Sequence, residues 1–502
     1  MRNKFLISFI FVIAVVLRLY NLDAYGIWFD EKGNILSANG IVLNKNFSEK
    51  AAFTNVDFKS NNTRKNVIKA NNITDSGNSI LYVILLHFWS QIFSNSDFAT
   101  RLLSVILNLA TLLILFKLSK RLTSSTPIAI LSLLLFAFQQ QFIEFSHEIR
   151  AYCLSLFLVV LSSHFMFNIL LDPITTNRNK KSLFLYASFS LLAILSHYLT
   201  IYIIITQSIL LLIHLIKQKK SVIYFISIHL LVVGLFALWM IYFGWDGYKY
   251  MSKRNADIAN RIIASETGSE NELLKVTFIN YFKAVIQWFS IILNCFLQEA
   301  GLRIRHYWPN IFLHFVPLFF AIKKNKISKQ IKWILILLIL SSLVFNSFSA
   351  ISADHLTSFF PKYSIFSIPY ATLLLSIGLV RAWEQPGKFS KILSASITLS
   401  ILICMSVNYY FTIYSNKKNF HFYPNGRSKN PYYTIAKKIE KEYCQKDTII
   451  IASWTDASLI NLYIGKQLYI QKIDSTIIHK VLIKHDTLTK NIFTFEGNNK
   501  FN

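Results

Sequence analysis

Two adjacent carboxylates follow the first apolar segment of the chain. That segment covers residues 5–20, and the stretch at residues 25–31 reads YGIWFDE and ends in Asp30 and Glu31. A carboxylate at a membrane surface stays hydrated and ionised, so it can accept a proton from an acceptor hydroxyl or orient that hydroxyl for attack. The structural alternative is that Asp30 caps a helix starting at Glu31 and that both acids are solvated.

A second polar group separates two apolar segments at residues 144–152, which read EFSHEIRAY. A simple turn needs no ionisable side chain, and ionisable groups at membrane depth are candidates for function. The planar guanidinium of Arg150 can bind a phosphate through two hydrogen bonds. The alternatives are a contact with lipid headgroups or an internal pair between Glu148 and Arg150. His147 beside Glu148 would suit a metal, but no second Cys/His cluster has ligand spacing, so we predict no metal site.

Weaker candidates lie at the outer ends of other apolar segments. Lys362 and Tyr363 precede a late segment, where a cation and a hydroxyl can meet a lipid phosphate. The alternative is a snorkelling lysine beside a tyrosine of the interfacial belt. His197 at a hairpin and Arg101 at the start of the second segment are candidates of the same kind.

The composition of the chain indicates the structural class of the protein in which these residues lie. Of 502 residues, 53% are hydrophobic and 15% are charged, and the mean hydropathy is +0.42. Soluble domains carry about 25% charged residues, so the chain is predicted to be an all-α polytopic membrane protein. The net charge of +27 does not predict a nucleic-acid partner. Much of the Lys and Arg excess sits in short clusters between apolar segments, where cytoplasmic loops face anionic lipids.

About eleven apolar segments approach the roughly 20 residues needed to cross a bilayer. Two more, at about 80–95 and 281–297, are predicted to lie along or dip into the outer face, because the basic clusters then fall on the cytoplasmic side. The first segment resembles a signal peptide but lacks a cleavage site, so we expect an anchor that ends in a snorkelling Arg18.

This topology divides the chain into two predicted domains. Residues 1–412 form a transmembrane domain with outer loops at about 21–79 and 244–306, and residues 413–502 form a small extracytoplasmic α/β domain. Apolar spacing and β-branched runs predict the elements of that second domain. They are a helix at 432–443 and strands at 447–453 and 458–464.

Four sequence blocks occur in an order that resembles a known family. The blocks are WFDE, LYVILLHFW with the following SDFATRLLSVILNLATLLILFKLSKRL, FIEFSHEIRAY and FFPKYSIFSIPYATLLLSIGL. Together they resemble the GT-C integral-membrane glycosyltransferases, in the branch of protein O-mannosyltransferases and lipid A aminoarabinose transferases. The resemblance covers roughly residues 1–380 and implies a GT-C fold, a polyprenyl-phosphate-linked sugar as donor, and transfer at the outer membrane face.

The resemblance also implies roles for several residues. Asp30 matches the family's acid near the acceptor, with Glu31 as its neighbour. Glu148 and Arg150 match the acid and the arginine of the family's S-Q-E-x-R-x-Y block.

Three departures from the family pattern concern the donor pocket more than Asp30. Lys362 and Tyr363 stand where the family has an Arg-Tyr pair, so the charge is kept and the bidentate fork is lost. His147 replaces the usual Gln, and residues 78–79, Asn-Ser, replace a Pro-Pro pair.

The resemblance, taken with these residues, implies a metal-independent glycosyltransferase that needs no cofactor. Asp30 would take the acceptor's hydroxyl proton, and one displacement would invert the anomeric centre of a hexosyl or pentosyl group. Preorganised cations are expected to stabilise the leaving phosphate. We expect these to be Arg150 and Lys362, with Arg101 and Tyr363, supported by His147, Glu148 and His197. The acceptor is a glycan, lipid or protein, and the active site is expected to face outward from the cell inner (plasma) membrane.

Two other function classes stay open. A transporter of lipid-linked glycans would need charged or broken helices at mid-membrane, and these segments have almost none. A polysaccharide polymerase or ligase would carry its arginines in a late outer loop, and Arg303 and Arg305 fit that pattern.

Overall fold

The computed structural model divides the chain into two compact units. Unit 1 contains residues 1–20, 104–240 and 251–426, and unit 2 contains residues 21–103, 241–250 and 427–502. The residues that the structure describes are 2–24, 26–27, 29–42, 52–54, 63–172, 177–218, 222–264, 274–292, 308–323, 327–410, 430–442, 449–451, 459–460, 462–463, 469–472 and 493–495.

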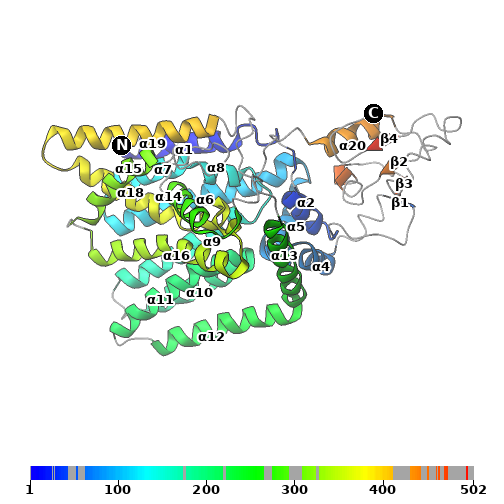
Figure 1. Ribbon diagram of the computed structural model, residues 1–502, viewed down its shortest axis with the longest axis horizontal. Coiled ribbons are helices and arrows are strands. Elements are labelled where there is room, and N and C mark those ends of the chain that lie inside the picture. The colour runs from blue at the N-terminus through cyan, green and yellow to red at the C-terminus, as the bar shows by residue number, and fades with distance from the viewer. Residues whose placement is uncertain are drawn as a thin grey trace. The chain divides into compact units, whose positions relative to one another are not determined.

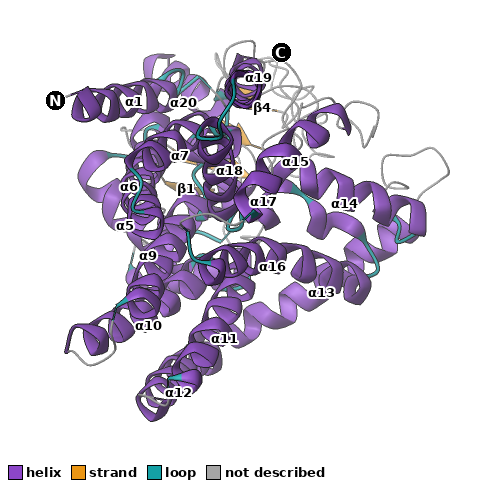
Figure 2. Cartoon of the chain, turned by 90° about the vertical axis from the view of Figure 1, so that its left-hand side faces the viewer, coloured by secondary structure: helices purple, strands orange, loops and turns teal. Residues whose placement is uncertain are grey.

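Unit 1 consists of helices (Figures 1 and 2). Their bounds are α1 Arg2–Leu19, α7 Thr126–Phe138, α8 Gln140–Ser146, α9 Tyr152–Leu171, α10 Asn177–Ser196, η1 Tyr198–Thr200, α11 Ile201–Lys217, α12 Val222–Trp239, α14 Phe278–Ile292, α15 Trp308–Ile322, α16 Lys329–Ala353, η5 Leu356–Phe359, α17 Pro361–Ser364, α18 Ile368–Trp383 and α19 Lys388–Tyr409. Three elements run across the division of the chain: α6 Asp97–Thr123, the π-helical turn η2 Met240–Gly244 and α13 Trp245–Ile263.

Six helices in the described part of the chain are long and apolar enough to cross a membrane. The pair α7 and α8 makes a seventh if the two count as one span, bent by 53° at Gln139. The helical, polytopic class is therefore confirmed, while the number of eleven spans stays a prediction. The two stretches predicted to lie at the outer face are α5 (Ile80–Phe93) and α14, with 14 and 15 residues. Both are shorter than the roughly 20 residues of a span.

Buried polar side chains join the helices of unit 1. Gln207 on α11 donates from Nε2 to Ser163 Oγ on α9 at 2.8 Å and to Tyr370 OH on α18 at 3.3 Å. Inside a membrane, hydrogen bonds of this kind fix helix partners and contribute about 0.6–2 kcal/mol each. They therefore set which faces of α9, α11 and α18 meet.

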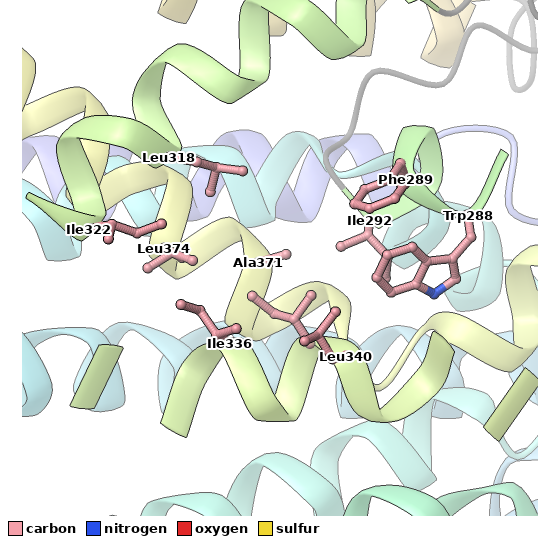
Figure 3. A pocket seen from close by; sticks show the side chains of 10 residues that line it. Trp288, Phe289, Ile292, Leu318, Ile322, Ile336, Leu340, Ala371 and Leu374 are labelled. Carbon is pink, nitrogen blue, oxygen red and sulfur yellow. The ribbon is translucent and has the colours of Figure 1, made fainter. Parts of the chain in front are cut away.

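An apolar cavity of about 180 Å³ lies among α14, α15, α16 and α18 (Figure 3). Its walls are aliphatic and aromatic side chains, so it has little to offer a water molecule. They are Trp288, Phe289, Ile292, Leu318, Ile322, Ile336, Ile339, Leu340, Ala371 and Leu374.

The closest approach between α15 and α18 depends on a glycine. A Cβ atom added at Gly378 would lie 1.8 Å from the backbone oxygen of Pro317. Backbone atoms cannot rotate away as a side chain does, so any larger residue at position 378 separates the two helices.

We expect Gly378→Ala to lower the free energy of unfolding by about 1–3 kcal/mol, the usual effect of overpacking. Gly234→Ala on α12 is the matched control, because a Cβ there has nothing within 4 Å. The control should be neutral or stabilise by up to about 1 kcal/mol through helix propensity. Thermal unfolding of both variants in one detergent measures the difference, and equal shifts would contradict the contact.

Unit 2 combines α2 and α4 from the first predicted outer loop, α5 from the stretch predicted at the outer face, and elements of the C-terminal segment. The helices α2, α4 and α5 pack on one another. A four-stranded sheet has the order β1-β3-β2-β4, with β3 antiparallel to β1 and parallel to β2, and β2 parallel to β4. The bounds are α2 Phe29–Ala38, β1 Ala52–Thr54, α4 Arg64–Asp75, α20 Pro431–Glu442, β2 Ile449–Ile451, β3 Tyr469–Lys472 and β4 Phe493–Phe495.

The C-terminal elements test three sequence predictions. Helix α20 and strand β2 confirm the helix predicted at 432–443 and the strand predicted at 447–453. The strand predicted at 458–464 is wrong: the residues described there are helical. Leu459, Ile460 and Tyr463 are buried, and their spacing of one and three residues fits one face of a helix.

Candidate active site

Asp30 and Glu31 lie in the first turn of α2, which begins at Phe29. Asp30 is therefore a residue of the helix and not its cap, contrary to the structural alternative. Two carboxylates in this turn are stabilised by the positive end of the helix dipole. Their surroundings differ, since Asp30 is half-buried and Glu31 is fully buried. Asp30 alone of the pair keeps a surface that an acceptor can reach.

Glu31 is paired with Arg101 from the start of α6. Arg101 Nη2 lies 3.4 Å from Glu31 Oε2, and both side chains have 0% exposure. The guanidinium also donates to the backbone oxygens of Leu22 at 3.1 Å and Gly26 at 3.2 Å. These contacts tie α2 and the residues before it to α6. They do not support the phosphate-binding role predicted for Arg101, and that role stays a prediction.

We expect Glu31→Ala to destabilise the protein by about 3–5 kcal/mol, because it leaves the Arg101 charge buried without its carboxylate. The control is Asp172→Ala, which removes a more exposed pair with Arg121, with exposures of 40% for Arg121 and 20% for Asp172. Exposed pairs contribute about 0–1 kcal/mol. Thermal unfolding compares the two losses, and a Glu31→Ala effect no larger than the control would contradict a structural pair.

The C-terminal segment holds the same helix from another side. Lys32 Nζ on α2 hydrogen-bonds to Tyr432 OH on α20 and lies 4.7 Å from the centre of that ring. Asn430 Oδ1 accepts from the backbone N–H of Tyr432 at 3.0 Å and so caps α20. Within unit 2, α20 therefore contacts the residue next to Glu31.

A second contact joins the C-terminal segment to the start of α6. Asp97 accepts from Asn430 Nδ2 at 2.9 Å and from Tyr463 OH at 2.7 Å. Burial and the neighbouring Asp97 carboxylate hold the pKa of Tyr463 well above its usual range, so its hydroxyl stays protonated and donates.

The polar corner at residues 144–150 follows the bend between α7 and α8. Gln139 at the bend accepts from the backbone N–H of Phe142 at 2.9 Å and caps α8. Ser104 Oγ donates to the backbone oxygen of Glu148 at 2.7 Å, which ties the corner to α6. His147, Glu148 and Arg150 are buried, with exposures of 1%, 3% and 6%. A buried corner that holds ionisable groups favours a functional role over contact with headgroups.

Two cations from distant parts of unit 1 act on one histidine. His197 lies in the turn between α10 and η1, and its ring stacks on Tyr152 with centres 5.3 Å apart. The Arg150 guanidinium lies 5.6 Å from the centre of the same Tyr152 ring. Burial first, then the charges of Arg150 and Lys362, hold the pKa of His197 well below its usual range. The imidazole is therefore neutral, and its Nδ1 accepts from the backbone N–H of Leu199 at 3.2 Å.

Lys362 and Tyr363 lie in the short helix α17, ahead of α18. Lys362 Nζ is 5.4 Å from the centre of the Tyr363 ring, and both side chains are half-buried. The backbone oxygen of Tyr363 accepts from Tyr202 OH on α11 at 3.1 Å. The sequence predicts both residues at the start of a late membrane segment. In the structure, a turn at residues 365–367 separates α17, which carries them, from α18.

The predicted site residues thus fall into two groups. Unit 1 contains the donor-side residues except Arg101, and unit 2 contains Asp30 and Glu31 together with Arg101. The prediction that both groups share one pocket stays a prediction. The groups are Arg150, Lys362, Tyr363, His147, Glu148 and His197 in unit 1, and Asp30, Glu31 and Arg101 in unit 2.

Sequence reasoning missed several residues that organise these groups. Tyr152 lies inside the quoted corner but received no role, and Lys32 follows the acidic pair directly. Arg18 was expected to snorkel, and this is wrong: its exposure is 0%. The available signal was its position: a charged residue at the end of an apolar segment is a candidate for a specific buried contact. The polymerase alternative rests on Arg303 and Arg305, and both lie outside the described residues.

No group of three or more His, Cys, Asp or Glu side chains that could hold a metal ion occurs among the described residues.

Comparisons with known proteins bear on the whole arrangement. The profile of a family described as dolichyl-phosphate-mannose-protein mannosyltransferase matches residues 78–242. This range includes Arg101, the corner and His197. A comparison with curated protein sequences gives no match.

Solved structures share the fold at low sequence identity. ArnT from Cupriavidus metallidurans in the apo state has a TM-score of 0.54 at 11% identity, over 93% of this chain and 86% of that chain. The same enzyme bound to undecaprenyl phosphate gives 0.51 at 11% identity, over 92% and 84%. The oligosaccharyltransferase of Archaeoglobus fulgidus tethered to an acceptor peptide gives 0.50 at 11% identity, over 92% and 63%. The chain therefore has the GT-C glycosyltransferase fold, and its resemblance to mannosyltransferases and ArnT is confirmed.

Proposed function

We propose that the protein is a glycosyltransferase that moves a sugar from a polyprenyl-phosphate-linked donor to an acceptor at the outer face of the membrane. The observation that carries the proposal is the buried corner of unit 1, where Arg150 lies 5.6 Å from the centre of the Tyr152 ring and His197 stacks on the same ring. Lys362 adds a second positive charge that acts on His197. Two positive charges beside a neutral imidazole suit a dianionic or monoanionic phosphate. The structure of ArnT with undecaprenyl phosphate supports the same class of ligand.

The reaction is a single displacement at the anomeric carbon. The acceptor oxygen forms a bond to that carbon while the bond from the carbon to the phosphate oxygen breaks, and its electron pair leaves with the lipid phosphate. Asp30 takes the acceptor's hydroxyl proton, and Arg150 and Lys362 stabilise the charge that develops on the phosphate. One displacement inverts the anomeric configuration of the hexosyl or pentosyl group.

Glu31 and Arg101 act in this proposal as positioning residues. Their buried pair fixes the first turn of α2, and so fixes Asp30 relative to the start of α6. Asp30 can then act from a rigid helix and not from a loop, which favours catalysis by orientation.

The proposed location follows the sidedness of the basic clusters. The protein would lie in the cell inner (plasma) membrane with Asp30, the polar corner and the segment 413–502 outside the cytoplasm. The donor would then arrive within the lipid, and the acceptor would be a glycan, lipid or protein of the cell envelope.

A panel of polyprenyl-phosphate sugars tests the proposal directly. Purified protein is incubated with each donor and with envelope acceptors, and release of the lipid phosphate is measured together with the transferred sugar. We expect release with at least one donor, dependent on an acceptor and lost in Asp30→Asn. Binding of every donor without release would instead support a transporter, and elongation of a lipid-linked glycan would support a polymerase.

A further inference from the structure

Arg18 is a fully buried cation at the C-terminal end of α1. Its Nε donates to Asn108 Oδ1 at 2.7 Å, and Nη1 donates to the backbone oxygens of Ala14 at 3.1 Å and Ala137 at 3.0 Å. Nη2 donates to the backbone oxygen of Phe136 at 3.5 Å. A buried charge is costly unless hydrogen bonds compensate it, so a guanidinium held by these contacts indicates a specific task.

The partners of Arg18 lie on the helix that breaks. Phe136 and Ala137 belong to the last turn of α7, whose carbonyls lose their usual i+4 partners because the chain is extended at Gln139; from the backbone, the Phe136 oxygen accepts only a long bond of 3.4 Å from the Gln139 N–H. The positive guanidinium also meets the negative end of the α7 dipole. Arg18 therefore satisfies the end of α7 that the 53° bend exposes.

Asn108 on α6 completes the contact on the other side of the bend. Its Nδ2 donates to the backbone oxygen of Phe142 on α8 at 2.9 Å and lies 3.6 Å from Cys153 Sγ at the start of α9. Arg18 thus holds the end of α7, Asn108 holds α8, and the bond between the two side chains links both halves.

The broken helix leads directly into the polar corner. α8 ends at Ser146, and only three residues separate it from Arg150. The path and direction of α8 therefore set where the Arg150 guanidinium lies. We propose that Arg18 and Asn108 are positioning residues for the donor-phosphate site, which hold the break between α7 and α8 and thereby place Arg150. This inference rests on the phosphate role of Arg150 in the proposed function.

Two conservative variants separate this role from simple stability. Arg18→Lys keeps the charge and loses the fork that reaches Asn108 and both α7 carbonyls. Asn108→Asp keeps an acceptor for Arg18 and loses the Nδ2 donor that contacts the Phe142 oxygen and Cys153 Sγ. Ser163→Ala and Tyr370→Phe are controls, because each removes a buried hydrogen bond elsewhere in unit 1.

The first readout is hydrogen exchange of the backbone at residues 139–150. Both variants should raise exchange there, and the controls should not. The second readout is the Kd of undecaprenyl phosphate in detergent micelles, which should rise about tenfold in either variant, since small displacements of a positioned group have effects up to about 10²-fold. In an Arg150→Lys background, the same changes should raise Kd less than about twofold, because coupled residues are not additive.

Unchanged exchange at 139–150, or an equal loss in both backgrounds, would overturn the inference. A wild-type protein that binds no undecaprenyl phosphate would instead remove the proposed function. In that case, a rise in exchange confined to the two variants would still show that Arg18 and Asn108 hold the break between α7 and α8.

Discussion

Replacing Asp30 by Asn is expected to abolish glycosyl transfer while the protein stays folded in the membrane. The amide has the shape of the carboxylate but cannot take the proton of an acceptor hydroxyl. General-base catalysis contributes about 10²–10⁴-fold, and the rate of transfer should fall by that factor. Asp30 is half-buried in the first turn of α2, whereas its neighbour Glu31 is engaged by Arg101. The loss should therefore appear in kcat with acceptor, and the Kd of the lipid phosphate should stay unchanged.

Asp23→Asn provides the matched control, because Asp23 is an exposed acid of the same predicted outer loop. It removes one negative charge from that loop and should leave transfer within about twofold, as surface substitutions usually do. Initial rates with a saturating donor, together with the elution profile in detergent, give the comparison. Near-normal transfer by Asp30→Asn would remove Asp30 from the mechanism.

The elements of this protein could be predicted where one local pattern decides them. Apolar runs gave the long helices, and helical spacing gave α20. The strand predicted at 458–464 was wrong because a short run of apolar residues is compatible with the period of a strand and with the period of a helix. Only the burial of Leu459, Ile460 and Tyr463 reveals the helical face. The local sequence cannot show which face of a segment is covered by an element from a distant part of the chain.

The site shows the same division between local signal and distant partner. The corner at residues 144–150 could be singled out as a candidate site from sequence alone. Ionisable groups between apolar segments are costly at membrane depth, so their presence there indicates a function. The pairing of Glu31 with Arg101 joins residues 70 positions apart, and Arg18 meets Asn108 across 90. The sequence alone gives each of these side chains a charge but no partner. The phosphate role of Arg101 therefore stays a prediction, whereas Arg18, expected at the membrane surface, is buried in the protein.

Arg150→Ala is expected to lower kcat/KM for the donor by about 10²–10³-fold, the usual effect of removing a preorganised group that stabilises developing charge. Arg150 is 6% exposed, its guanidinium lies 5.6 Å from the centre of the Tyr152 ring, and its charge acts with that of Lys362 on His197. The water-poor surroundings strengthen its interaction with a phosphate. Arg150→Lys should fall between the wild type and Arg150→Ala, because it keeps the charge and loses the planar fork.

The donor and acceptor kinetics distinguish this role from a general loss of function. Arg150→Ala should raise the KM of the donor and the inhibition constant of the lipid-phosphate product together, while the KM of the acceptor stays unchanged. Arg64→Ala removes an exposed arginine of the first predicted outer loop and controls for the lost positive charge. Lys362→Arg should maintain or tighten donor binding, since it adds a second bidentate fork to the donor-side residues. Donor kinetics that do not change in Arg150→Ala would show that the phosphate binds elsewhere, because a buried cation that touches the leaving group cannot be removed without effect on it.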